Sequence, residues 1–194
     1  MHSQTLEGKE EARTRWIFLT IFYCCAIIMA AITFYSLYVS VGEFIKTGRV
    51  VIGEVLVNTE FPAQGLAKLV TYLMIVSVVG WYCVTRLGGE KVKDIPSSIK
   101  SILQLIVLAI AVIALYEFIY NFIIWSSLIT ADAMKGIIRL DDLNLPYPNP
   151  ETPWNLVFAT KMSLSAFLIA AHGFYIMSKP STENTSLKQD SITY

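Results

Sequence analysis

Two ionisable residues lie inside the last apolar stretch of the chain, residues 154–178. Lys161 and His172 are 11 residues apart. In a helix this separation places them within roughly 20° of one face and roughly 16 Å apart along the axis. Because a charged side chain is costly in lipid, this face must meet something other than lipid. The pattern predicts a polar contact face on the last helix.

A carboxylate lies at a matching depth in the preceding apolar stretch. Glu117 and Asn121 are one helical turn apart. We expect Glu117 to pair with Lys161, and Lys68 is a second candidate partner, although a lysine near a helix end can also reach the membrane surface. Two interpretations stay open. Either a lysine neutralises Glu117 and the pair fixes the helix register, or Glu117 belongs to an ion or proton site.

Small residues line the opposite face of the last stretch at alternating spacings of four and three. Such a seam lets the backbone of another helix approach closely. The last helix therefore has two faces that avoid lipid, so it is either central in the fold or in contact with a second protein. Small seams also serve internal packing alone. The seam residues are Ala159, Ser163, Ala166, Ala170 and Gly173.

The sequence offers no set of residues for catalysis or metal binding. His172 and the cysteines Cys24, Cys25 and Cys83 have the wrong spacing for a compact metal site, and cysteine within a membrane usually acts as a small apolar residue. We expect His172 to form a hydrogen bond with Gln104 instead. Phosphate-binding loops and zinc-protease histidine pairs are absent. We predict no catalytic residue, no metal, no cofactor and no enzyme.

Composition indicates an all-α membrane protein. Apolar residues make up 55% of the 194 residues and charged residues only 15%, whereas soluble domains are about 25% charged. Four stretches reach the roughly 20 residues needed to cross a bilayer. We predict a bundle of four transmembrane helices over residues 16–178, a polar cytoplasmic tail at 1–15 and a polar, disordered cytoplasmic tail at 179–194. The predicted spans are residues 16–40, 65–86, 99–130 and 154–178.

Basic residues predict the orientation in the cell membrane. Nine lysines and arginines lie in the two tails and the connection between the second and third spans, and four lie in the other two connections. This excess places both termini in the cytoplasm. The two connections on the outside, residues 41–64 and 131–153, each exceed 20 residues.

Turn and capping residues predict where several helices begin and end. Thr152 followed by a proline is typical of a helix start, and Lys179 followed by a proline of a helix end. Gly88 and Gly89 can end the second helix. The third stretch is long enough that its helix must tilt or protrude. Residues 49–57 favour an extended segment around a glycine, with an interfacial helix as the alternative.

These observations favour a multi-pass protein that makes contacts rather than performs chemistry. The first hypothesis is a non-catalytic accessory or assembly subunit of a membrane complex. The second is a small oligomeric transporter or channel with a polar path through Glu117 and Lys161, and the third is a quinone- or redox-associated subunit. Expected partners are the lipid bilayer and other membrane subunits or a second copy. A formal net charge of zero does not suggest nucleic acid.

Overall fold

The fold consists of helices, in agreement with the predicted class. The computed structural model describes residues 2–89, 95–136 and 154–179, with the backbone alone for residues 2–9. In this part of the chain the only β-type pairings are two isolated bridges. Four of the five helices are long and apolar enough to cross a membrane, which fits a multi-pass membrane protein. The helices are α1 (His2–Thr47), α2 (Glu54–Asn58), α3 (Leu69–Gly88), α4 (Ser97–Met134) and α5 (Leu156–Ser178).

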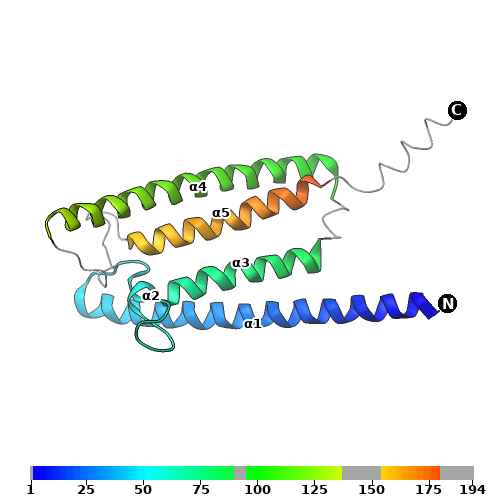
Figure 1. Cartoon of the computed structure of the whole chain (residues 1–194), viewed down its shortest axis with the longest axis horizontal. Helices are drawn as coiled ribbons and strands as arrows, with labels where there is room; N and C mark the ends of the chain where they lie inside the picture. The colour runs from blue at the N-terminus through cyan, green and yellow to red at the C-terminus, as the bar shows by residue number, and fades with distance from the viewer. Residues whose placement is uncertain (1, 90–94, 137–153, 180–194) are drawn as a thin grey trace.

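The four long helices form an open row in the order α1, α3, α5, α4 (Figure 1). Helix α1 packs against α3, α3 packs against α5, and α5 packs against α4. Among the described residues, α1 and α4 each have a single long neighbour, so these two are the edges of the row. The bundle is therefore open, with α3 and α5 in its middle.

The row is built from two antiparallel helix pairs. Helix α1 runs opposite to α3, and α4 runs opposite to α5, whereas the two central helices α3 and α5 run parallel (Figure 1). The start of α1 and the end of α5 lie at one end of the row, which we call the terminal end. The short helix α2 lies at the other end, which we call the loop end.

Several helix boundaries differ from the sequence prediction. Helix α1 continues backwards through the predicted tail and forwards to Thr47. It contains no proline and ends where Gly48 adopts a φ of +68°, with the Gly48 amide donating to the Phe44 carbonyl at 2.8 Å. Helix α4 is likewise one continuous helix beyond the predicted span. The ends of α3 at Gly88 and of α5 before Lys179 agree with the predicted stops.

The predicted start of α5 at Thr152 is wrong. Helix α5 begins at Leu156, and Asn155 caps it by accepting hydrogen bonds from the amides of Val157 and Phe158. An asparagine oxygen satisfies amides that have no partner within the helix, so it replaces the predicted threonine cap. Thr152 itself lies outside the described residues, as do most of the predicted outer loop 131–153 and the tail from residue 180 onward.

The connection between α1 and α3 folds back over the loop end of the row. Residues 50–52 are not helical, and Ile52 pairs with Trp154 in an isolated bridge, in which the Asn155 amide donates to the Ile52 carbonyl at 3.0 Å. The favoured extended interpretation is wrong for the second half of this segment, because α2 is helical there. The buried side chains of α2 are Val55, Leu56 and Val57, and the last two pack in an apolar cluster with residues of α1, α3 and α5, which stabilises the short helix.

Gly53 occupies a position that only glycine fits. Its φ is +84°, a conformation that side chains rarely adopt. A Cβ atom at this position would also overlap the ring of Phe158 at the start of α5. Gly65, in the same connection, has a φ of +86° but open space around the position of its missing Cβ atom. Comparing substitutions at Gly53 and Gly65 therefore distinguishes the cost of backbone strain from the cost of steric overlap.

Replacing Gly53 with alanine should destabilise the protein more than replacing Gly65. Both variants force a left-handed alanine, which costs about 1–2 kcal/mol, and Gly53→Ala adds an overlap of about 1–3 kcal/mol. The free energy of unfolding, measured by titrating the purified protein in mixed micelles with a denaturing detergent, checks this. Equal losses for the two variants would show that the connection does not pack on Phe158.

Candidate functional site

Lys161 joins the two central helices. Its Nζ donates a hydrogen bond of 2.7 Å to the Thr71 hydroxyl near the start of α3. Lys161 is half-buried. The predicted ion pair with Glu117 does not form. Lys68 is the residue directly before α3, makes no side-chain hydrogen bond to the start of that helix, and forms no ion pair with Glu117 either.

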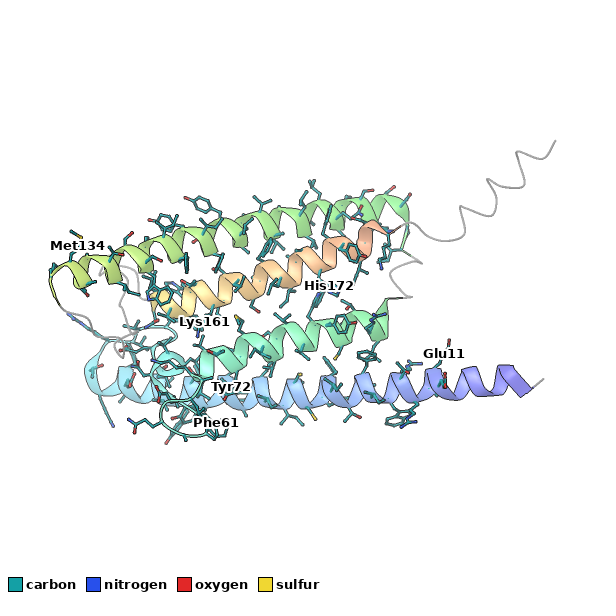
Figure 2. All side chains as sticks on the ribbon, in the orientation of Figure 1. Glu11, Phe61, Tyr72, Met134, Lys161 and His172 are labelled. Carbon is teal, nitrogen blue, oxygen red and sulfur yellow. The ribbon has the colours of Figure 1, made fainter. Side chains whose placement is uncertain are left out.

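His172 contacts the same neighbouring helix further along. Its ring centroid lies 5.7 Å from that of Tyr82 on α3, with the two planes 31° apart. Lys161 and His172 are labelled on α5 in Figure 2, where α3 and α4 flank that helix. The predicted common face of these two residues is therefore a contact face with α3.

The two contacts share one register. Lys161 and His172 are 11 residues apart on α5, and their partners Thr71 and Tyr82 are also 11 apart on α3. Parallel helices of equal rise keep equal spacings aligned over about 16 Å. The polar residues of α5 thus fix how far α3 and α5 are displaced along their common direction.

Tyr82 collects further contacts that the sequence analysis missed. The Arg86 Nε donates to the Tyr82 hydroxyl at 3.0 Å, and the Arg86 guanidinium lies 5.4 Å from the centre of the same ring. Phe18 of α1 meets the ring edge-on at 6.1 Å. Three helices therefore converge on this tyrosine at the terminal end. The sequence could have indicated this contact, because Tyr82 and Arg86 are four residues apart near a helix end, a spacing that brings two side chains together.

Gln104 has a different partner from the predicted one. Its Nε2 donates to the Met177 carbonyl at 3.0 Å and lies 3.4 Å from the Ser178 hydroxyl, and Lys100 reaches the Lys179 carbonyl at 3.4 Å. The last carbonyls of a helix have no partner within it. Residues from α4 therefore cap the end of α5, and the predicted hydrogen bond between His172 and Gln104 is wrong.

Glu117 and Asn121 lie in different surroundings although they are one turn apart. Asn121 is buried, and its Nδ2 donates to the backbone carbonyl of Glu117 at 2.7 Å. The Glu117 side chain is exposed on α4. Within the described residues its carboxylate has no hydrogen bond and no ion pair. These two residues do not form a joint buried site.

The small-residue seam of α5 contributes to internal packing. Ala170 and Gly173 are buried, and the remaining members, Ala159, Ser163 and Ala166, are half-buried. A Cβ atom on Gly173 would lie 3.3 Å from the Trp81 ring on α3 and 3.6 Å from Val107 on α4. Gly173 therefore lets both neighbours approach α5 at one level, so the predicted central position of this helix agrees with its contacts.

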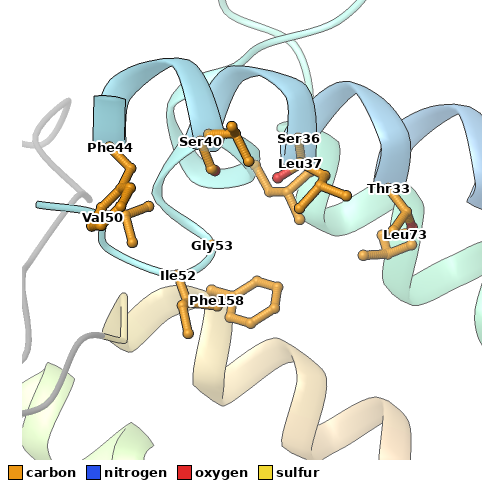
Figure 3. A pocket seen from close by; sticks show the side chains of 12 residues that line it. Thr33, Ser36, Leu37, Ser40, Phe44, Val50, Ile52, Gly53, Leu73 and Phe158 are labelled. Carbon is orange, nitrogen blue, oxygen red and sulfur yellow. The ribbon is translucent and has the colours of Figure 1, made fainter. Parts of the chain in front are cut away.

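An apolar pocket lies at the loop end between α1 and the start of α5 (Figure 3). Its volume is about 540 Å³. The hydroxyl groups of Thr33, Ser36 and Ser40 on α1 line it together with apolar side chains, and Phe158 and Gly53 close its other side. It contains no titratable side chain, so its lining offers no acid, base or nucleophilic thiol for catalysis.

The cysteines and the histidine do not converge. Cys24 is exposed, whereas Cys25 and Cys83 are buried in the contact between α1 and α3, where Cys25 packs near Gly80. Among the described residues no three His, Cys, Asp or Glu side chains form a group that could hold a metal ion. Side-chain hydrogen bonds link different helices at Lys161, which bonds to α3, and at Gln104, which bonds to the end of α5.

The chain matches no protein-family model, no curated protein and no solved structure.

Breaking the Lys161 contact should loosen the junction of α3 and α5. Hydrogen bonds between membrane helices contribute about 0.6 kcal/mol on average and up to about 1.7. We expect Lys161→Met and Thr71→Val to destabilise the protein and to show a coupling energy in this range in a double-mutant cycle, measured by detergent unfolding.

A matched cycle pairs Lys161→Met with Ser77→Ala. The Ser77 hydroxyl donates within its own helix, to the Leu73 carbonyl at 2.6 Å, so this pair should show no coupling. Equal coupling in both cycles, or none in either, would contradict the assigned contact.

Proposed function

We propose that this protein is a non-catalytic accessory or assembly subunit of a membrane complex. The observation that carries the proposal is the open row of helices, in which α1 and α4 each pack against one long neighbour within the described residues. A row of four helices encloses no common interior in which a path or a reaction site is shielded from lipid. It does offer two long edge helices for contact with other proteins.

The use of the polar residues supports the same proposal. Lys161, His172 and Gln104 each contact a neighbouring helix or its end. Polar residues inside apolar spans often mark transport paths or proton relays. Here these three are engaged in holding the helices together, which is the task of a structural subunit.

The transporter alternative has less support from the geometry. A polar path through Glu117 and Lys161 requires the two side chains to face a shared space. Helix α5 lies between α4 and α3, and Lys161 contacts the α3 side of it, whereas Glu117 is exposed on α4. A path would therefore need further chains to connect these two residues.

The proposed location is the cell membrane with both termini in the cytoplasm. The positive-inside bias of the nine basic residues in the tails and the connection between α3 and α4 supports it. An even number of spans agrees with the start of α1 and the end of α5 lying at the same end of the row (Figure 1). In this orientation the loop end faces the outside.

Gentle extraction of the tagged protein from its native membrane tests the proposal. We expect it to elute in a complex well above the 21.8 kDa of the chain and to retain other membrane proteins in stoichiometric amounts. The control is the same preparation after exposure to a denaturing detergent, which should release those proteins. Elution as a lone monomer after gentle extraction would contradict the proposal.

A further inference from the structure

Side chains of α4 are exposed around most of the helix, and one stripe of them runs along several turns and includes Glu117. Its members follow one another at spacings of four, three, four and three, the repeat with which a second helix packs along a stripe. The apolar members are 44–62% exposed, and Glu117 is exposed among them. We call this face the edge stripe, and it consists of Ile106, Ile110, Ile113, Glu117 and Tyr120.

The carboxylate of Glu117 lies near the middle of the apolar span. The apolar part of α4 extends over residues 102–125, so Glu117 is about 5 Å from its midpoint at a rise of 1.5 Å per residue. Within the described residues the carboxylate has no donor or cation. Lipid chains offer neither, so a charged carboxylate here is energetically costly.

Lys161, the lysine deep in the spans of this chain, does not supply a cation for the Glu117 carboxylate. Lys161 is bonded to Thr71 on the α3 side of α5, away from the edge helix α4. A second copy is also unsuited. A two-fold axis along the membrane normal would bring Glu117 against its own equivalent at the same depth, which is a repulsive contact.

We propose that the edge stripe binds a transmembrane helix of another protein, and that this helix carries a lysine or arginine near its midpoint. Isoleucines at the stripe positions pack against the partner helix, and Glu117 pairs with the basic residue. Charge complementarity selects this partner, because neither lipid nor a second copy supplies the cation. The inference rests on the proposed function and specifies which face is used and with what chemistry.

A designed peptide tests the chemistry directly. The purified protein is reconstituted in phosphatidylcholine vesicles with a labelled polyleucine transmembrane peptide that carries one lysine at its midpoint, and binding is followed by energy transfer. The reference peptide has leucine in place of the lysine. We expect the lysine peptide to bind about tenfold more tightly than the leucine peptide, and Glu117→Gln to remove this difference.

The variant should fold, because the exposed Glu117 side chain has no hydrogen bond or ion pair to lose within the described residues. Unchanged helical content and unfolding midpoint verify this. Glu117→Lys should reverse the preference, so that a peptide with a central glutamate binds more tightly. Equal binding of the lysine and leucine peptides to the wild-type protein, or a preference that persists in Glu117→Gln, would overturn the inference.

A pair of photo-crosslinking positions tests the face in native membranes. Ile113 lies about 40° around the helix from Glu117, and Ile119 about 160°. These residues are 62% and 47% exposed, so they serve as a matched pair. We expect a crosslinker at position 113, and not at 119, to capture a membrane protein with a basic residue near the midpoint of a span, and Glu117→Gln to reduce the yield.

Failure of the inference can be told apart from failure of the proposed function. If partners co-purify but crosslink at 119 rather than 113, or regardless of Glu117→Gln, the edge stripe is not the contact and the subunit role stands. If nothing co-purifies and neither position crosslinks, both proposals fail.

Discussion

The contact between α3 and α5 is the junction on which the rest of the structure depends. Each of the antiparallel pairs, α1 with α3 and α4 with α5, holds together through its own packing, and the row exists because α3 meets α5. In lipid the hydrophobic effect contributes little to helix association, so close packing and polar contacts must hold the helices together. Close packing is provided by Gly173, which lies against Trp81. The polar contacts are the hydrogen bond of Lys161 with Thr71 and the ring contact of His172 with Tyr82.

The loop end supports the register that the contacts of Lys161 and His172 define between α3 and α5. Two parallel helices keep their polar contacts aligned only when their starts are fixed relative to each other. The backbone hydrogen bond from Asn155 to Ile52 ties the start of α5 to the segment that precedes α2, while Asn155 also caps α5. The close approach of Gly53 to Phe158 completes this attachment. The connection is thus part of the fold rather than a simple tether, although its β-branched residues suggested an extended chain.

The sequence predicts what depends on local pattern and misses what depends on neighbours. Apolar length indicates four spans, and helical periodicity places Lys161 and His172 on one face, because both properties belong to a single segment. The pairing of Glu117 with Lys161 was argued from equal depth, yet depth does not tell which helices are adjacent, and α5 separates α4 from α3. Thr71 gave no signal because a threonine in an apolar helix usually bonds to its own backbone. Asn155 was missed because a threonine before a proline also fits a helix start.

The two edges of the row differ in what can cover them. Between Trp16 and Glu43, α1 contains no Asp, Glu, Lys or Arg, and its exposed side chains there, such as Ile27 and Phe34, are ones that lipid covers at no cost. Helix α4 presents the same apolar surface with one carboxylate near its middle. Lys161 and His172, the basic residues of α5, contact α3 inside the row. Those two have contacts inside the row, whereas the Glu117 carboxylate has no hydrogen bond or ion pair within the described residues. For this reason the proposed protein partner is placed at α4 rather than at α1.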